Sequence, residues 1–171
     1  LKARGCNSFA ICYLHAYRNF THEQRTLEIL QEEAPGLRVS LSHRVSPEMR
    51  EFERTSTTVL NALLMPVVGA YLERIERRLA DAGVNATLYL VQSNGGVTTP
   101  ATAAEQPARL LLSGPSGGAM AMQQLAALTG ETNLVGFDMG GTSTDIAVVR
   151  DGQTTVVTEG TIDGLPVRLP M

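Results

Sequence analysis

The chain has 171 residues, of which 43% are hydrophobic, 18% are charged and 5% are aromatic, with no Trp and a net charge of −3. This composition is typical of a globular protein that buries a core, and it gives no electrostatic or base-stacking case for binding nucleic acid. The apolar runs are shorter than a membrane span, so we expect no membrane partner.

The first 45 residues predict a strand–helix–strand unit. The segment SFAICYLHAY (8–17) begins as a continuous apolar run, which is typical of a strand buried on both faces. The segment THEQRTLEILQEE (21–33) has helical spacing with Thr21 placed to cap it, and LRVSLSH (37–43) alternates as a second strand. Because a helix joins the two strands, we expect them to be parallel.

The cysteines and histidines show no spacing typical of a metal site. Cys6 and Cys12 are the only cysteines, and we interpret them as small buried side chains in a reducing compartment. The sequence carries no secretory signal, so we expect a cytoplasmic protein.

A long helix is predicted from Thr55 to Ala80, with a break or kink at Pro66 and a stop at Gly83. A helix start is also expected at Ser46-Pro47-Glu48. The charged segment REFERTSTT (50–58) allows two interpretations. We favour a solvated, salt-bridged helix start, and the alternative is a contact between lobes or a wall of a substrate site.

A further strand is expected over Ala86–Gln92, and a polar turn follows it: Ser93, Asn94, Gly95, Gly96. Ligands of open α/β sheets bind beyond strand ends, so Ser93 and Asn94 could hold a substrate carbonyl or amide. The alternative is an Asn-Gly turn with a capping Ser. A short helix or turn is then expected over TPATAAEQP (99–107), and SGPSGG (113–118) is expected to be a turn that opens a helix.

That helix is expected from about Ser116 to Leu128. The segment SGPSGG contains no Lys, so it is not a Walker A loop. We favour a structural role, with Pro115 at the helix start and Gly117-Gly118 allowing close packing, over anion binding at the helix start.

Three strand signals end the chain, at Asn133–Met139, Thr144–Arg150 and Thr154–Glu159. The turns between them are expected at Gly140-Gly141 and Asp151-Gly152. Short turns of this kind join antiparallel neighbours, so the sequence predicts an antiparallel β-meander.

The first turn of this meander carries more polarity than a hairpin needs. Asp138 ends an apolar strand, and the chain continues with Gly140, Gly141, Thr142, Ser143, Thr144 and Asp145. Glycine turns expose N–H groups that suit phosphate oxygens, and the three hydroxyls add donors. Asp138 can hold Mg²⁺, and Asp145 could hold the same ion or orient a water. Strand alternation would put Ser143 and Asp145 on one face and Thr142 and Thr144 on the other.

We therefore predict a phosphate and divalent-cation site at this turn. The reasoning is that buried polar groups without protein partners need a ligand. The alternative is a purely structural hairpin, in which the glycines serve only to adopt positive φ.

The pattern Asp-x-Gly-Gly-Thr-x-Thr-Asp, here DMGGTSTD (138–145), resembles the phosphate-binding hairpin of the actin, Hsp70 and sugar-kinase superfamily. More narrowly, it resembles the hydantoinase A/5-oxoprolinase family, which includes N-methylhydantoinase and acetone-carboxylase subunits. Four other segments resemble that family in the same order: EFERTSTTVLNALLMPVVGAYLERIE, LVQSNGGV, RLLLSGPSGGAM and GLPVRLPM.

The resemblance implies an α/β fold of the actin/Hsp70/sugar-kinase-like (ribonuclease H-like) ATPase type, here truncated. Residues 1–45 would be the C-terminal end of an upstream α/β domain, and residues 46–171 the N-terminal part of a hydantoinase A/oxoprolinase domain. Family members carry a related Asp-x-Gly-Gly-Thr hairpin near their start, which is absent here. The isolated piece is therefore expected to bind ATP weakly or not at all, to be inactive, and to self-associate.

The resemblance also implies ATP-dependent opening of a cyclic amide such as a hydantoin or 5-oxoproline. ATP and Mg²⁺, or another divalent cation, would be the cofactors. Asp138 would position the metal, Gly140 to Thr144 would bind phosphate, and Asp145 would be the catalytic residue that assists metal or water. The alternatives are a subunit of an ATP-dependent ketone carboxylase and a non-catalytic, nucleotide-responsive scaffold. A hydantoinase B-type subunit or domain and a homo-oligomer are the expected partners.

Overall fold

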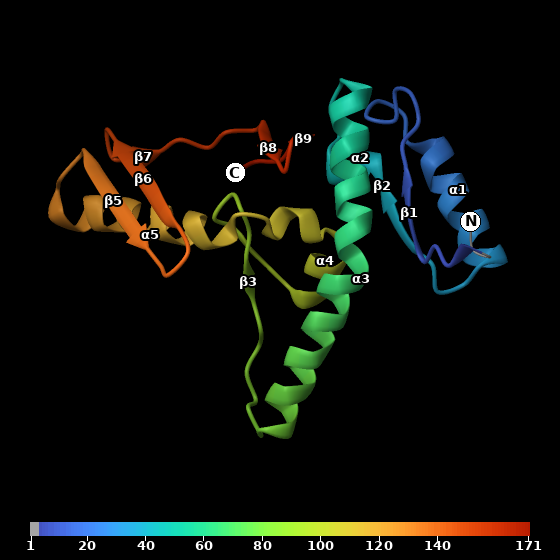
Figure 1. Cartoon of the computed structure of the whole chain (residues 1–171), viewed down its shortest axis with the longest axis horizontal. Coiled ribbons are helices and arrows are strands. Elements are labelled where there is room, and N and C mark those ends of the chain that lie inside the picture. The colour runs from blue at the N-terminus through green and yellow to red at the C-terminus, as the bar shows by residue number, and fades with distance from the viewer. Residues whose placement is uncertain (1–3) are drawn as a thin grey trace.

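The structure is a computed structural model and describes residues 4–171. A single long helix, α3 (Glu51–Asp81), runs through the middle of the molecule (Figure 1). The N-terminal strands and helix lie on one side of α3, and helix α5 (Ser113–Thr129) with an antiparallel sheet lies on the other (Figure 1). The candidate phosphate hairpin is therefore far from the N-terminal unit.

The N-terminal unit has the predicted strand–helix–strand order. β1 (Ser8–Ile11) and β2 (Arg38–Leu41) are parallel neighbours, and α1 (Thr21–Glu33) connects them. Apolar side chains from all three elements form one core cluster: Ile11, Leu27, Leu41, Leu30, Val39. The expected cap at Thr21 is wrong, because Asn19 Oδ1 accepts hydrogen bonds from the Thr21 N–H (3.1 Å) and hydroxyl (2.7 Å).

Helix α3 begins at Glu51, which is after the start expected at Ser46-Pro47-Glu48 and before the start expected at Thr55. It is not broken. The short helix α2 (Ser42–Val45) precedes it, and Ser46-Pro47-Glu48 is not helical. α3 is continuous through Pro66, so the expected break is wrong. The helix axis does change direction partway along, which agrees with the kink that was the other expectation (Figure 1). Pro66 leaves the Ala62 carbonyl without its helical donor. The Ser8 hydroxyl supplies the missing hydrogen bond at 2.5 Å.

The end of α3 is a Schellman motif, as the stop at Gly83 predicted. Gly83 has a φ of +71°, and its N–H donates to the Ala80 carbonyl at 2.9 Å. The Val84 N–H donates to the Leu79 carbonyl, also at 2.9 Å.

By length and composition alone, α3 could cross a membrane, contrary to the expectation from the apolar runs. Its inward face, however, carries polar residues that are bonded into the fold. Asn61 is fully buried and contacts β2, the end of α4 (Pro100–Glu105) and the 3-10 helix η2 (Pro107–Leu110). We therefore interpret α3 as the central helix of a folded domain.

The start of α3 is salt-bridged as expected, by the pairs Arg50–Glu53 (3.7 Å) and Arg54–Glu51 (3.5 Å). It is solvated only in part, because Arg54 lies in a buried polar network. Arg54 has no exposed surface and donates to the Ser42 hydroxyl (3.2 Å) and to the carbonyls of Glu48 (2.7 Å) and Tyr13 (2.8 Å). The burial of Arg54 could not be predicted from the sequence, because its hydrogen-bond partners come from segments outside the helix.

Glu23 is the acidic centre of the same network. Its carboxylate is fully buried and accepts from the Tyr13 N–H, the Ser42 hydroxyl and the His43 N–H, and lies 2.7 Å from His43 Nδ1. Burial raises the pKa of Glu23, but the hydrogen bonds from Ser42, His43 and Tyr13 outweigh it, so the net pKa lies below the ordinary value of 4.5.

The expectation of two buried cysteines is also wrong. Cys6 is exposed, and Cys12 is half-buried with its sulfur 3.0 Å from the Thr55 hydroxyl.

The connection between α3 and α5 contains less strand than expected. β3 is only Leu90–Val91 and pairs with β4 (Val97–Thr98), so the predicted strand over Ala86–Gln92 is mostly irregular. The short helix α4 is confirmed, with Thr99 as its cap. α5 begins at Ser113, so SGPSGG forms its first turns rather than a preceding turn.

The C-terminal sheet confirms the β-meander. β5 (Leu134–Met139), β6 (Thr144–Arg150) and β7 (Gln153–Thr154) are antiparallel in that order, with β7 shorter than expected. The chain then forms a hairpin that was not predicted, β8 (Gly160–Ile162) and β9 (Leu165–Val167). Its strand β9 packs on α3, and the core there consists of Val45, Ala108, Val167 and Leu169.

Replacing Glu23 by Gln should lower the free energy of unfolding by about 2–3 kcal/mol near neutral pH, because a charged acceptor of buried hydrogen bonds is lost. Folding lowers the pKa of Glu23, so the carboxylate stabilises the wild type above the unfolded pKa, and this stability is lost as the pH falls through the folded pKa. Urea denaturation between pH 3 and pH 7 should show this loss in the wild type and a flatter profile in the variant. Glu28→Gln, on the exposed side of α1, is the control and should follow the wild type.

Candidate functional site

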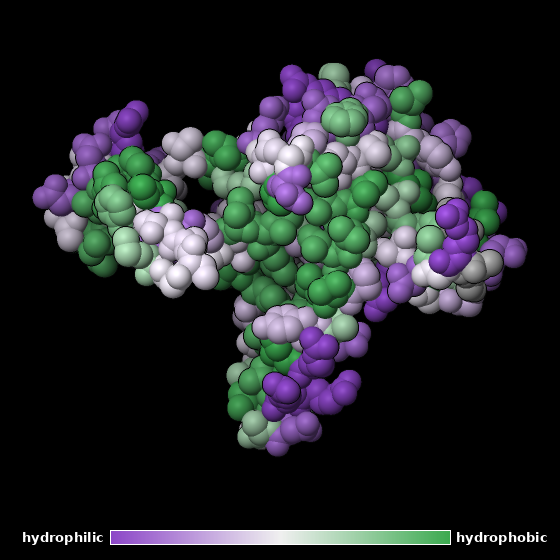
Figure 2. Space-filling model, in the orientation of Figure 1, coloured by the Kyte–Doolittle hydropathy of each residue, from purple (hydrophilic) through white to green (hydrophobic). Residues whose placement is uncertain are grey.

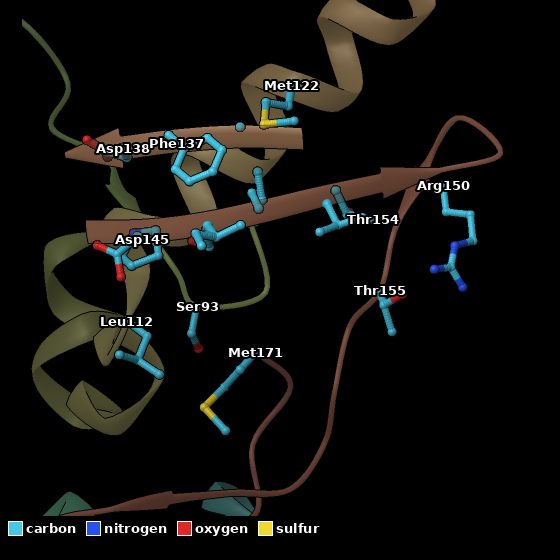
Figure 3. A pocket seen from close by; sticks show the side chains of 18 residues that line it. Ser93, Leu112, Met122, Phe137, Asp138, Asp145, Arg150, Thr154, Thr155 and Met171 are labelled. Carbon is cyan, nitrogen blue, oxygen red and sulfur yellow. The ribbon is translucent and has the colours of Figure 1, made fainter. Parts of the chain in front are cut away.

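A cavity of about 770 Å³ lies between β6, the first half of α5, the turn after β3 and the C-terminal Met171. Figure 2 shows the molecule hollowed between the C-terminal sheet and the main body. Three of the residues singled out from the sequence line this cavity: Ser93, Asp138 and Asp145. Two of them, Asp138 and Asp145, lie at the same end of the paired strands (Figure 3).

The two carboxylates are brought together by strand register. Asp138 in β5 is directly paired with Asp145 in β6, so their side chains share one face of the hairpin. By alternation the same face carries Gly136 and Ala147, and it is the face on which α5 packs. At Gly136 a Cβ would lie 1.8 Å from Met122 Sδ of α5, so this glycine allows the helix its close approach.

The Asp138–Asp145 pair is a like-charge contact without a neutralising partner. Asp138 is exposed and Asp145 is half-buried, and among residues 4–171 neither makes an ion pair. Like charges directly opposite each other on a sheet destabilise it by about 0.2–1 kcal/mol. The polarity of the hairpin is therefore not explained by burial, as the sequence reasoning assumed.

The donor set fits a hard divalent cation such as Mg²⁺. Carboxylate oxygens are its preferred protein ligands, and Mg²⁺ commonly keeps several waters or phosphate oxygens beside one or two carboxylates. Within the described part of the chain, no group of three or more His, Cys, Asp or Glu residues could hold a metal. The protein would therefore contribute this pair, and waters or a ligand would complete the coordination.

The backbone conformation of the loop between β5 and β6 does not require glycine. It comprises residues 140–143, closed by the Gly140 N–H donating to the Ser143 carbonyl at 3.0 Å. Neither Gly140 nor Gly141 has positive φ, and a Cβ at Gly141 would meet nothing within 4 Å. The structural alternative, glycines chosen for positive φ, is therefore wrong. Bare backbone at an exposed turn suits a ligand that approaches closely.

The hydroxyls of the loop lie at the exposed tip. Thr142 and Ser143 belong to the loop, and β6 begins only at Thr144. The expected alternation of side chains between the two faces therefore applies to Thr144 and Asp145, and not to Thr142 and Ser143. Residues 140–144 do not line the cavity, whereas Asp138 and Asp145 do.

The turn after β3 is a capped turn, and only its first residue reaches the cavity. Asn94 Oδ1 accepts from the Gly96 N–H at 2.9 Å, and Gly95 has a φ of +81°. Ser93 is buried, and its hydroxyl lies 3.1 Å from the carbonyl oxygens of both Arg109 and Pro170, to either of which it can donate. Asn94, Gly95 and Gly96 do not line the cavity.

The segment SGPSGG, for which the sequence favoured a structural role over anion binding, contributes to the cavity wall. Leu112, Pro115, Ser116 and Gly118 line the cavity at the start of α5. The close-packing explanation is wrong, because a Cβ at Gly114, Gly117 or Gly118 would meet nothing within 4 Å. The open space at these glycines could not be predicted from the sequence.

A comparison with protein families identifies the chain. The model of the family described as hydantoinase/oxoprolinase matches residues 54–171. The chain belongs to the hydantoinase/oxoprolinase family. The match includes most of α3 and the Asp138–Asp145 hairpin.

Curated relatives of this family member include a caprolactamase subunit and a 5-oxoprolinase. The chain is 38% identical over 145 residues to caprolactamase subunit alpha of Pseudomonas jessenii, covering 85% of this chain and 21% of that protein. It is 33% identical over 171 residues to 5-oxoprolinase of Saccharomyces cerevisiae, covering 99% of this chain and 13% of that protein. The chain thus spans a quarter or less of the length of these relatives.

A solved structure confirms the fold of this hydantoinase/oxoprolinase chain. The nucleotide-free structure of acetone carboxylase, an enzyme of ATP-dependent acetone carboxylation, matches with a TM-score of 0.80 and 27% identity, covering 100% of this chain and 24% of that chain. The mixed α/β fold is of the actin-like ATPase type, as expected.

Asp138→Asn should raise the free energy of unfolding in buffer without divalent cations by about 0.2–1 kcal/mol, because it removes one of two opposed charges. Asp145→Asn should do the same, and the double variant should gain little more than either. A double-mutant cycle by urea denaturation in EDTA measures this coupling. If Asp138→Asn instead destabilised the fold by about 1–3 kcal/mol, Asp138 would be a structural acceptor and not half of a cation site.

Proposed function

We propose that this chain carries the metal and phosphate side of the active site of an ATP-dependent cyclic-amide hydrolase, and that the protein acts in the cytoplasm. The observation that carries the proposal is the Asp138–Asp145 pair, for which residues 4–171 supply no ion-pair partner. The pair lies beside a loop whose two glycines are not needed for positive φ. The similarity to 5-oxoprolinase and to a caprolactamase subunit supports a ring amide as the substrate class.

In this proposal the hairpin binds the nucleotide phosphates. Asp138 and Asp145 would hold Mg²⁺, and the Gly141 N–H with the hydroxyls of Thr142, Ser143 and Thr144 would donate to phosphate oxygens. Gly140, whose own N–H is bonded to the Ser143 carbonyl, would contribute bare backbone that a phosphate can approach closely. When bound, Mg²⁺ neutralises the negative charge that builds up on the phosphoryl group during transfer. The protein residues fix the orientation of that group before reaction.

The reaction follows from the difficulty of hydrolysing an unactivated amide ring. Transfer of the γ-phosphoryl group to the ring carbonyl oxygen makes the carbonyl carbon an electrophile. ADP is released by this transfer. Water adds to the carbonyl carbon, and the C–N bond breaks as the nitrogen takes a proton, which leaves an acyl phosphate. A second water hydrolyses the acyl phosphate to carboxylate and inorganic phosphate. Asp145 orients the attacking water or assists the metal, and Ser93, on the cavity wall, is the candidate contact for the substrate. Asn94, Gly95 and Gly96 would contribute through the shape of their turn.

A second candidate function is supported by the solved acetone carboxylase structure. A ketone carboxylase subunit would use the same phosphate hairpin and phosphorylate a different oxygen. A partner subunit of the hydantoinase B type fits either function, since the caprolactamase relative is itself a subunit, and a homo-oligomer belongs to the same proposal. A scaffold that responds to nucleotide without turnover is the remaining alternative, which the following assay separates.

In the whole protein, Asp138→Asn should reduce amide-dependent ATP hydrolysis by about 10²-fold or more, because a charge-stabilising group is lost from the phosphoryl-transfer site. Asp145→Asn should give a smaller loss. Asp81→Asn, an exposed acid at the end of α3, is the matched control and should retain wild-type turnover. Normal turnover in folded Asp138→Asn protein would contradict the proposal, and turnover with a ketone and bicarbonate but no cyclic amide would favour the carboxylase.

A further inference from the structure

The hydroxyl of Ser93, on the cavity wall, bonds only to hydrogen-bond acceptors among residues 4–171. It lies 3.1 Å from the carbonyl oxygens of Arg109 and of Pro170, and a carbonyl oxygen cannot donate. The single hydroxyl proton is therefore directed to one of these two carbonyls. The lone pairs of the Ser93 oxygen remain, so Ser93 offers an acceptor, and not a donor, to a molecule in the cavity.

The Pro170 carbonyl is the partner that keeps this proton in place. The Arg109 carbonyl already accepts from the Ser93 N–H at 2.8 Å, whereas no other group of residues 4–171 donates to the Pro170 carbonyl. Ser93 is only 4% exposed, so water has little access to the contact. If the hydroxyl turned its proton toward a substrate, it would leave the Pro170 carbonyl without a partner, which is costly where water cannot replace the bond.

Ser116, at the start of α5, lines the same cavity and is committed in the same way. Its hydroxyl lies 2.9 Å from the Gln92 carbonyl oxygen and 2.8 Å from the Ser113 carbonyl oxygen, so its proton also goes to the backbone. The bond to Gln92 holds the turn after β3 against α5, and the backbone of Gly95 in that turn lies so close to Met120 that a Cβ would not fit. The hydroxyls of Ser93 and Ser116 thus form an acceptor wall whose position is fixed.

The acceptor wall lies at the carboxylate end of the hairpin. Residues 130–133 reverse the chain between α5 and β5, and Met122 of α5 lies against Gly136 of β5. Ser116 precedes Met122 in α5, and Asp138 follows Gly136 in β5. Because the two elements run in opposite directions, Ser116 and Asp138 are displaced toward the same end of the cavity.

The other lining side chains that carry hydrogen-bond donors are Arg150, Thr154 and Thr155. Arg150 ends β6, about 17 Å along the strand from Asp145. Figure 3 shows Arg150 and Thr155 on one side of the view and Ser93 on the side of Asp145. The end of the cavity near the two carboxylates is therefore the end at which the serines present acceptors.

We propose that the acceptor wall binds the N–H group of the substrate's ring amide, with Ser93 as the contact, so that the site selects ring amides whose nitrogen carries a hydrogen. This inference rests on the proposed function of the cavity. A small ring holds its amide cis, so the N–H and the carbonyl oxygen leave the same edge of the ring. With the N–H on Ser93, the carbonyl oxygen stays at the hairpin end, and the serines offer it no donor. Its lone pairs remain free to attack the phosphoryl group.

The test compares 2-pyrrolidinone with γ-butyrolactone, a ring of similar shape in which an oxygen replaces the N–H. In NMR titrations of the full ¹⁵N-labelled chain, 2-pyrrolidinone should shift the Ser93 amide signal and bind at least about 10-fold more tightly than the lactone, because only the amide donates to Ser93. In Ser93→Ala this preference should fall to about 2-fold or less, because the acceptor is gone. Ser113→Ala, in the first turn of α5 but not on the cavity wall, is the matched control and should keep the wild-type preference. Circular dichroism checks that both variants are folded.

Three outcomes would overturn the inference: equal binding of the two rings by the wild type, an unchanged preference in folded Ser93→Ala, and no binding of either ring. In the whole protein, Ser93→Ala should raise the KM for the ring amide by at least about 10-fold with a smaller change in kcat, because a binding contact is lost. Selective binding of 2-pyrrolidinone without turnover of any ring amide would support the inference and contradict the proposed function. Turnover of ring amides with equal binding of the two rings would do the reverse.

Discussion

Asn61 of α3 makes hydrogen bonds to three segments that are far apart in the sequence, and the arrangement of the whole molecule depends on these bonds. Its amide donates to the Ser40 hydroxyl of β2 and to the Glu105 carbonyl at the end of α4, both at 3.0 Å. Its oxygen accepts from the Ala108 N–H at 3.1 Å. One turn earlier in α3, the Thr57 hydroxyl accepts from the Arg168 N–H. Because these groups are buried, each would be costly without its partner, so the polar face of α3 fixes how the elements around it meet.

The candidate site is positioned by the same arrangement. Beyond Arg168 the chain reaches Pro170, whose carbonyl is one of the two acceptors within reach of the Ser93 hydroxyl, and Met171 then lines the cavity. On the far wall, register rather than a tertiary contact holds Asp138 opposite Asp145. A fold that places two carboxylates side by side without an ion pair has a local electrostatic cost, which a bound cation would remove. The cation role proposed for the pair agrees with the similarity of the chain to acetone carboxylase, an enzyme of ATP-dependent carboxylation.

Much of the fold could be predicted from periodicity and turn residues, and the failures have definite physical causes. The parallel unit, the Gly83 stop and the meander are local patterns that the structure confirms. The break at Pro66 was wrong because a hydroxyl from β1 satisfies the freed carbonyl. The β8–β9 hairpin had a readable signal: Asp163-Gly164 has the same left-handed backbone as the predicted turn at Asp151-Gly152. For the site, the sequence located Asp138, Asp145 and Ser93, but the roles of Asn94 and of SGPSGG depend on hydrogen bonds and open space that only coordinates reveal.

The central claim is that Asp138 and Asp145 together hold a divalent cation beside the phosphate loop. Paramagnetic broadening by Mn²⁺, a substitute for Mg²⁺, tests it most directly in ¹⁵N-labelled chain by NMR. Substoichiometric Mn²⁺ should broaden the amide signals of Asp138, Asp145 and the 140–143 loop first, and the D138N/D145N variant should lose this local effect while its other signals stay unchanged. Broadening centred on another acidic region, or equal broadening in the variant, would contradict the account.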